Sequence, residues 1–257
     1  MKKRLILNLL ITLLMAMPIT LSAQDWVIED RDGSITFISG DWIKIIDPEE
    51  EGFTSIYNLS AGKLILINTD SESYSEGSLD DYCEALNEMT SSMMEGMTPE
   101  QKEMMEAYMS QSNSGPAPEV KIEGKGAGEK IAGFSTEKYA VMVDGELYEE
   151  VWISSDEALM KLVDLYKKME PMTMEMVKCS AMEINLENDP DFSEAYLGLM
   201  HKGMELKSVR HEYGSPEPGT DIIRVEQTSI PASEFKPPAN FKKVDFQPFL
   251  APQEDMD

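Results

Sequence analysis

The sequence predicts an α+β protein whose antiparallel β-sheet is covered on one side by helices. Most of the predicted strands are separated only by short turns, as in hairpins, and the strands outnumber the helices. Helical patterns interrupt the strands in two places, at about residues 78–110 and 155–201. Hairpin-linked strands with helices gathered in a few places are typical of this fold class.

The first 23 residues have the pattern of a cleaved secretory signal peptide. A basic start, MKKR, precedes the apolar run LILNLLITLLMAM, and the small residue Ala23 ends the segment. The apolar run is shorter than the roughly 20 residues that cross a bilayer, which disfavours a membrane anchor. No cysteine follows directly that could carry a lipid, so we expect a periplasmic or secreted bacterial protein without a stable anchor.

The charge of the chain is strongly acidic and excludes some partners. The formal net charge is −26, from 22 Lys and Arg and 48 Asp and Glu. Cleavage would remove Lys2, Lys3 and Arg4, leaving 19 basic residues and a net charge of −29. Such a surface repels nucleic acids and anionic lipid head groups. It favours solubility, and no motif supports the alternative of a basic partner.

Residues 26–74 are predicted to form consecutive short strands. The predicted strands are WVIED, SITFIS, DWIKIID, FTSIYNLS and KLILINT. Each is rich in β-branched or aromatic residues, and the last two flank a short glycine turn that indicates a hairpin. KLILINT is apolar at most positions, so we expect a central strand covered on both faces.

The apolar period changes to that of a helix at Ser78. Apolar residues recur at helical spacing through SLDDYCEALNEMTSSMMEG, and Ser78 is the expected N-cap because acidic residues follow it. A second helix is expected from Thr98, where Pro99 and Gln101 complete the pattern of a capping box. SQSNSGPAPE then has the composition of a loop.

Further strands and a long helix follow this loop. The predicted strands are VKIEG, EKIAGF and the hairpin STEKYAVMVDGELYEEVWISS, and later GMELKSVRHEY, TDIIRVEQTSI and FKKVDF, with SPEPG as a turn. A helix capped by Ser155 is expected over residues 155–181, bent or divided at Pro171, and a short helix within residues 188–203. We expect residues 24–250 to form a single domain and residues 251–257 to be a disordered tail.

The two cysteines, Cys83 and Cys179, suggest one disulfide in an oxidising compartment. The bond would close a loop of about 96 residues and stabilise the fold by roughly 4–5 kcal/mol on the chain-entropy model. Two separate buried thiols are the alternative, because the Cα separation decides the matter.

No catalytic motif is present in the sequence, and we expect a protein that is not an enzyme and uses no cofactor. His201 and His211 lack the spacing of a metal pair, and ordinary surface or half-buried histidines are the simpler interpretation. The glycine-rich GKGAG at 124–128 lies between predicted strands, so it indicates a hairpin loop rather than a phosphate-binding loop.

Methionine is abundant, with 20 residues in the chain. Methionine side chains adapt to varied apolar shapes, so a methionine-lined hollow could bind an apolar ligand. The alternative is that these methionines only fill the core. Both interpretations place the methionines in the interior, and they differ in whether an empty cavity remains. A third possibility is Cu(I) or Ag(I) on thioethers, for example at Met89, Met93 and Met97, although no histidine lies near them. The methionines predicted to line a ligand site are Met89, Met93, Met94, Met97, Met104, Met105, Met109, Met169 and Met176, with Met172 and Met174 as further candidates.

Three segments of the sequence form a recognisable set, namely GEKIAGFSTEKYAV, EEVWISSD and SEFKPPANFKKVD. On these segments the chain resembles an uncharacterised family of bacterial periplasmic proteins, and the resemblance covers nearly the whole chain after residue 23. That family is similar in fold to the outer-membrane lipoprotein carriers LolA and LolB. The resemblance implies a strongly curved antiparallel half-barrel closed by helices around an apolar hollow, and it supplies no catalytic residues.

These observations together favour a non-enzymatic periplasmic protein that binds a lipid or a lipoprotein acyl chain. Its expected partners are a lipid or a lipidated protein. The alternatives are a soft-metal binding protein and a structural envelope protein that acts through a protein partner. The oligomeric state is left open by the sequence.

Overall fold

A computed structural model describes residues 25–48, 52–104, 116–179, 186–212 and 215–250. Its framework is one sheet of twelve strands in the order β12-β6-β5-β4-β3-β2-β1-β11-β10-β9-β8-β7. Neighbouring strands run antiparallel, except that β12 runs parallel to β6. In the described part of the chain β12 and β7 do not pair with each other, so the sheet is open. The strands are β1 (Asp25–Asp30), β2 (Ile35–Ser39), β3 (Trp42–Ile46), β4 (Phe53–Asn58), β5 (Lys63–Asn68), β6 (Ser73–Ser78), β7 (Val120–Ala127), β8 (Glu137–Val143), β9 (Glu146–Ser154), β10 (Met204–Glu212), β11 (Ser215–Thr228) and β12 (Lys242–Lys243).

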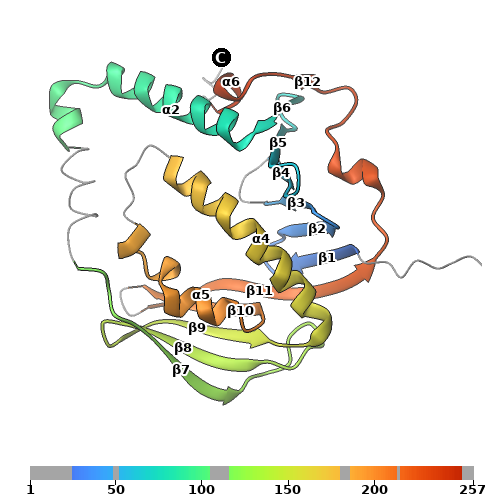
Figure 1. Cartoon of the computed structure of the whole chain (residues 1–257), viewed down its shortest axis with the longest axis vertical. Helices are drawn as coiled ribbons and strands as arrows, with labels where there is room; N and C mark the ends of the chain where they lie inside the picture. Colours follow the sequence, from blue (N-terminus) through green and yellow to red (C-terminus); the bar gives the residue numbers. More distant parts are fainter. Residues whose placement is uncertain (1–24, 49–51, 105–115, 180–185, 213–214, 251–257) are drawn as a thin grey trace, which may run out of the picture.

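The sheet curls around a long central helix, α4 (Figure 1). The helices are α2 (Leu79–Gly96), α4 (Glu157–Cys179), α5 (Glu194–Met200) and α6 (Phe246–Leu250), with short 3₁₀ turns η1 (Leu186–Asn188), η2 (Pro190–Phe192) and η3 (Ala232–Phe235). Helix α2 lies beside β6 and α6, and α5 packs against β7 and its neighbours β8 and β9 (Figure 1). An α+β fold with a large, mostly antiparallel sheet is thus confirmed.

The helix starts predicted at Ser78 and Thr98 are confirmed. The Asp81 amide donates to the Ser78 hydroxyl at 3.1 Å, and the Asp81 carboxylate accepts the Ser78 amide at 2.7 Å. Thr98 and Gln101 exchange the same pair of bonds, at 2.8 and 3.3 Å. Each reciprocal pair satisfies amides that the first helical turn would leave unbonded.

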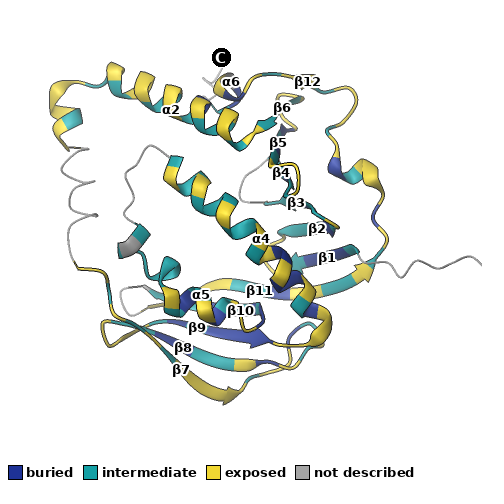
Figure 2. Cartoon of the chain, viewed as in Figure 1, coloured by how far each residue is buried: buried dark blue, intermediate teal, exposed yellow. Residues whose placement is uncertain are grey.

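Strand β5 is buried on both faces, as its apolar sequence predicts. Leu64 and Leu66 face the main core, in which the N-terminal half of α4 is the most buried helical segment (Figure 2). Ile65 and Ile67 face a second cluster that the segment containing Ile230 and Phe235 covers from outside. The two clusters explain why this strand needs no polar face.

Three sequence predictions about local structure are wrong. EKIAGF is not a strand: Ile131 and Phe134 exchange backbone hydrogen bonds around a tight turn in which Ala132 and Gly133 both have positive φ. GKGAG is not a hairpin loop, because β7 continues to Ala127 through a bulge between Gly124 and Gly126. SPEPG is the beginning of β11 rather than a turn.

Helix α4 begins one residue later than predicted and is not divided. The carboxylate of Asp156, rather than the Ser155 hydroxyl, accepts the Ala158 amide at 3.0 Å. The helix runs without interruption through Pro171, which is exposed. A proline on a solvent-facing turn removes one hydrogen bond, and the packing of the preceding turns holds the helix together.

Several predictions fall outside the described residues. They concern the signal peptide over 1–23, the tail over 251–257, the part of the first helical segment over 105–110, and the end of the long helix at 180–181. Among the described residues, none of the helices combines the length and the hydropathy needed to cross a bilayer.

Candidate functional site

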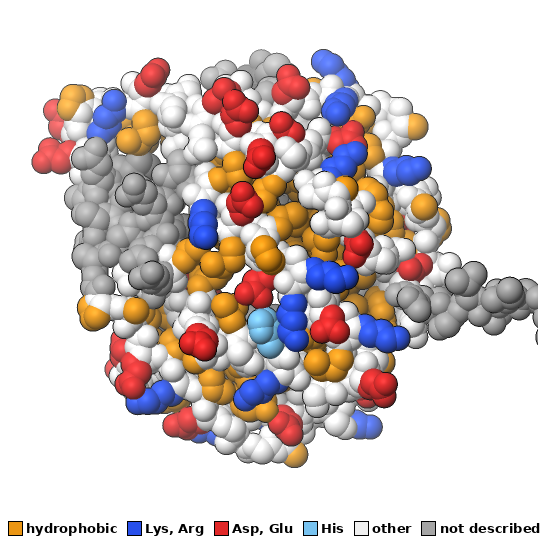
Figure 3. Space-filling model, in the orientation of Figure 1, with side chains coloured by type: hydrophobic (Ala, Val, Ile, Leu, Met, Phe, Trp, Pro, Cys, Tyr) orange, Lys and Arg blue, Asp and Glu red, His pale blue; other side chains and the backbone are white. Residues whose placement is uncertain are grey.

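A cleft lies between α4, α5 and the inner face of the sheet. Its larger part, the main cavity, has a volume of about 410 Å³ and is walled by Val163 and Tyr166 of α4, Leu197 of α5 and Ile28 and Ile222 of the sheet. Figure 3 shows hydrophobic side chains around a hollow in this region, with charged groups near its rim. The volume lies within the range of about 300–1,000 Å³ of small-molecule sites.

A second, more apolar space, the side cavity, adjoins the main one. Its volume is about 240 Å³, and Ile45, Met169, Met174 and Phe192 belong to its lining. The residues that line both cavities are Thr36, Tyr166, Glu170 and Leu197. The two spaces therefore adjoin each other along α4, and together they are called the cleft.

Charged side chains lie on the walls of the main cavity. The carboxylate of Glu170 on α4 is 3.0 Å from Nε2 of His201 at the end of α5, which ties the two helices together. The carboxylate of Asp30 accepts the backbone amide of Asp221 at 3.0 and 3.2 Å. Glu205 of β10 also lines this cavity, from the sheet.

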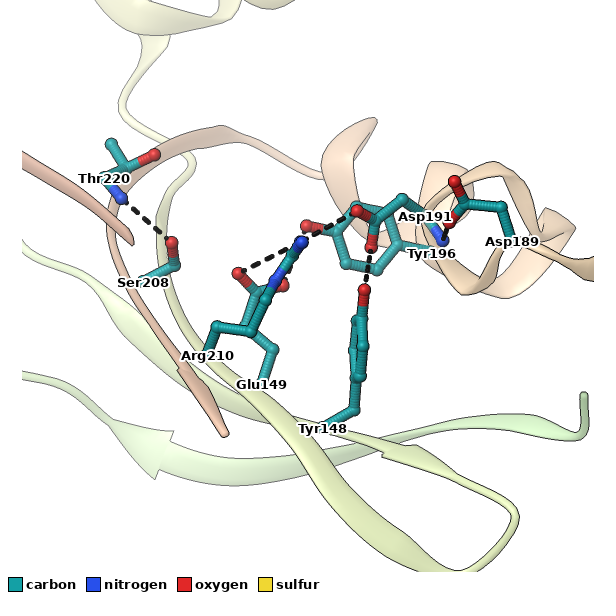
Figure 4. Close-up of polar contacts among 8 residues, drawn as sticks. All are labelled: Tyr148, Glu149, Asp189, Asp191, Tyr196, Ser208, Arg210 and Thr220. Atoms are coloured by element: carbon teal, nitrogen blue, oxygen red, sulfur yellow. Dashed lines mark hydrogen bonds and ion pairs between the residues drawn. The ribbon is translucent and has the colours of Figure 1, made fainter. Parts of the chain in front are cut away.

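A polar network with a buried centre connects β9 and β10 to η2 and α5 (Figure 4). Its centre is Glu149 of β9, whose side chain is 4% exposed. The Tyr196 hydroxyl donates to Glu149 at 2.8 Å, and an Arg210 nitrogen lies 3.9 Å from the same carboxylate. Arg210 donates to Asp191 at 2.7 Å, and the Tyr148 hydroxyl donates to Asp191 at 3.1 Å.

A β-bulge brings these groups together. Val141 of β8 pairs with Glu149 and Met142 pairs with Leu147, which leaves Tyr148 without a partner in β8. The extra residue allows Tyr148 and Glu149 both to reach the segment that carries Asp191, because a bulge re-aims side chains.

Two caps fix the other side of the network. The Asp189 carboxylate accepts the Asp191 amide at 2.9 Å and starts η2 (Figure 4). The Ser193 hydroxyl accepts the Tyr196 amide at 3.2 Å and starts α5. These bonds orient Asp191 and Tyr196 toward the strands.

Burial dominates the electrostatics of this region. It raises the pKa of Glu149 above its ordinary value, and the hydrogen bond from Tyr196 and the charge of Arg210 only partly oppose this. Burial also raises the pKa of Glu205, which hydrogen bonds from Thr220 and Ser208 oppose and the nearby Glu149 increases. Burial would lower the pKa of Arg210, but Asp191 more than compensates and the pKa is raised. Burial therefore raises the pKa values of two carboxyl groups that influence each other, and one of them, Glu205, lines the main cavity.

The predicted methionines are only partly at this cleft. Met169 lines the side cavity and Met176 packs against the main core, with Met172 beside it and Met174 in the side cavity. Met89, Met94 and Met97 are half-buried but line none of the cavities found next to the sheet. Met105 and Met109 lie outside the described residues.

The prediction that Met93 and Met104 face the hollow is wrong. Their exposed fractions are 48% and 73%. The reason is the position of α2, which packs on α6 at the edge of the sheet and buries only Ala85 fully. Met200 of α5 and Met204 of β10 line the main cavity instead.

Cys83 and Cys179 form a disulfide with a Cα–Cα distance of 5.3 Å. The bond joins the first half of α2 to the last residue of α4. It is therefore the covalent link that holds the edge helix to the helix over the cleft.

Neither histidine has a metal-site geometry. His201 is exposed and bonds Glu170, and Nε2 of half-buried His211 lies 3.6 Å from Glu150, beyond hydrogen-bond distance. No group of three His, Cys, Asp or Glu residues in the described ranges is placed to hold a metal ion.

Sequence reasoning missed the residues that matter most here, namely Tyr148, Glu149, Asp191, Glu205 and Arg210. One signal was present: Glu149 shares a strand face with Val151 and Ile153, which are apolar and buried. A carboxylate on an otherwise apolar face indicates a buried polar partner.

The curled sheet and the central helix define an α+β protein with a cleft along this helix and a polar network next to it. The sequence profile of a domain of unknown function, DUF4412, matches residues 80–241, and the chain belongs to this family. That range contains α2, α4, α5 and the strands of the polar network. None of the curated proteins matches the sequence.

Proposed function

We propose that the protein binds an apolar ligand, a lipid or the acyl chain of a lipoprotein, in the cleft along α4, and that it catalyses no reaction. The observation that carries the proposal is the elongated space formed by the main and side cavities. Apolar side chains form most of its walls, and four methionines, Met169, Met174, Met200 and Met204, take part in the lining. Unbranched thioether side chains adjust to ligands of different shape.

The arrangement of the sheet supports a likeness to the lipoprotein carriers LolA and LolB. In those proteins a half-barrel encloses an apolar hollow under helices, and here the sheet curls around α4 (Figure 1). The pattern of residues 1–23 supports a periplasmic or secreted location, where lipids and lipidated proteins are available partners.

A direct test is to identify what the protein carries. The full chain is expressed with its N-terminal segment, purified without detergent and extracted with organic solvent, and the extract is examined by mass spectrometry. We expect lipid or fatty acyl species in stoichiometric amount. An extract without them, together with no binding of added amphiphiles, would overturn the proposal.

A variant pair assigns the binding to the cleft. Leu197 lines both cavities, so Leu197→Trp should fill the junction and reduce ligand content at least severalfold. Ile223 is 48% exposed and lines neither cavity, so Ile223→Trp is the matched control and should leave the ligand content unchanged. Equal loss in both variants would place the ligand elsewhere.

A further inference from the structure

Glu205 is a carboxyl group of the main cavity that forms no ion pair within the described residues. Its backbone belongs to β10, paired with Ile153, and its side chain lines the main cavity but not the side cavity. No ion pair joins its carboxylate to another side chain in the part of the chain that the structure describes. Its hydrogen bonds come from the neutral groups of Ser208 and Thr220.

The other charged groups of the cavity are engaged elsewhere. Glu170 bonds His201, and Asp30 accepts the amide of Asp221 twice. Lys167, the lysine of the lining, lies 3.7 Å from Asp164 on its own helix. Three carboxylates against one lysine and one histidine give the main cavity a negative potential.

The polar network behind Glu205 increases this imbalance. Glu149 lies close enough to raise the pKa of Glu205 by its charge. Arg210, the cation of the network, makes its shorter contact with Asp191, at 2.7 Å, and stands 3.9 Å from Glu149. A cation placed beside Glu205 would supply the counter-charge that this part of the cavity lacks.

We propose that the cleft selects an amphiphile with a protonated primary amine, whose head group pairs with Glu205 while its apolar chain lies along α4 in the side cavity. This inference rests on the function proposed above and names the head group of its ligand. The spatial order agrees with it, because Glu205 lines only the main cavity whereas Ile45, Met174 and Phe192 line only the side cavity. An amine supplies both the missing positive charge and donors for the carboxylate oxygens.

The test compares three ligands of equal chain length and different head group. Dodecylamine, dodecanol and dodecanoate are titrated into the delipidated full chain by calorimetry, below their critical micelle concentrations. We expect dodecylamine to bind about tenfold or more tightly than dodecanol, because a charge-assisted hydrogen bond contributes that much, and dodecanoate to bind most weakly.

Two isosteric variants separate the site from the acidic surface. Glu205→Gln should abolish the preference for dodecylamine over dodecanol. Glu123→Gln, on the exposed strand β7, removes the same charge away from the cleft and should bind dodecylamine as the wild type does. If the amine bound only through a general attraction to an acidic protein, the two variants would lose the same amount of affinity for dodecylamine.

The outcomes separate the two proposals. If dodecanol binds and the amine shows no preference, or keeps its preference in Glu205→Gln, the amine proposal is wrong and apolar binding stands. If none of the three ligands binds, the proposed function itself is wrong.

Discussion

The Tyr196 hydroxyl donates a 2.8 Å hydrogen bond to Glu149, and this bond connects α5 to the strand beneath it. Tyr196 is 9% exposed and Glu149 is 3% exposed, so no solvent molecule can easily replace the bond. Helix α5 forms one wall of the cleft through Leu197. The bond therefore positions the wall as well as satisfying a buried acid.

Removing this hydroxyl should destabilise the protein clearly. We expect Tyr196→Phe to lower the free energy of unfolding by about 1–3 kcal/mol, because the buried carboxylate loses its donor. The matched control is Tyr139→Phe, whose hydroxyl donates to exposed Glu137 at 2.6 Å, and it should change stability by less than about 0.5 kcal/mol. Urea unfolding measures both, and similar losses would contradict the role given to the buried bond.

The two neighbouring acids of β9 should respond to pH in opposite directions. Because burial raises the pKa of Glu149, the native state holds its proton more tightly than the unfolded state does. The stabilisation from this group is present at low pH. It is lost as the pH rises through the ordinary pKa of a glutamate and then through the raised pKa of Glu149 in the native state. The wild type should therefore lose stability relative to Glu149→Gln as the pH rises above the ordinary pKa of a glutamate.

Glu150, the next residue of β9, should have the opposite effect on how stability changes with pH. The hydrogen bond from Lys138 lowers the pKa of Glu150, so its stabilisation is present above the ordinary value and is lost as the pH falls. The wild type should gain stability relative to Glu150→Gln as the pH rises over the acidic range. Unfolding curves of the three proteins across pH test this, and slopes of the same sign would contradict the assignment.

Reduction of the disulfide should weaken the fold substantially. Cys83 and Cys179 are 96 residues apart, for which the chain-entropy model gives roughly 4–5 kcal/mol. We expect dithiothreitol to lower the free energy of unfolding of the wild type by this order. The double variant Cys83→Ala, Cys179→Ala should start at the lower value and be insensitive to the reductant. A loss below about 1 kcal/mol would show that the tertiary contacts hold α2 and α4 without it.

Ligand affinity should increase with chain length and then level off. Each methylene removed from water contributes about 0.8 kcal/mol, which corresponds to roughly a fourfold gain in affinity. In a series of linear alcohols, we expect this increment until the chain fills the side cavity and no further gain after that. In Leu197→Trp, the affinity should stop increasing at a shorter chain length of the alcohol. Affinity independent of length would mean that the chain stays in solvent.

The elements of this fold were predictable where local signals determine them. Ser78 with its acidic neighbours predicts the start of α2, and the apolar run around Ile65 predicts a strand that is buried on both faces of the sheet. Asp144 and Gly145 predict the turn between β8 and β9, and both have positive φ. In each case the sequence pattern and the observed conformation involve residues only a few positions apart.

The site was not predictable for the opposite reason. Its groups come from β9, η2, α5 and β10, and a bulge that no local pattern announces turns Tyr148 toward Asp191. The methionines of α2 have helical spacing, but spacing does not reveal that this helix lies at the edge of the sheet, where Met93 is exposed. Long-range packing decides which face of a helix becomes an interior wall.

The pairing of β1 with β11 has a consequence for how the chain reaches this structure. Asp25 lies opposite Thr228, so the first strand of the sheet is bonded to one of the last to leave the ribosome. The hairpins from β1 to β6 can form early, since their partners are adjacent in sequence. Until β11 is synthesised, β1 presents an open strand edge, which other chains can pair with. Pairing of β1 therefore waits until β11 has been synthesised, and slow synthesis would prolong the interval in which nascent chains can aggregate.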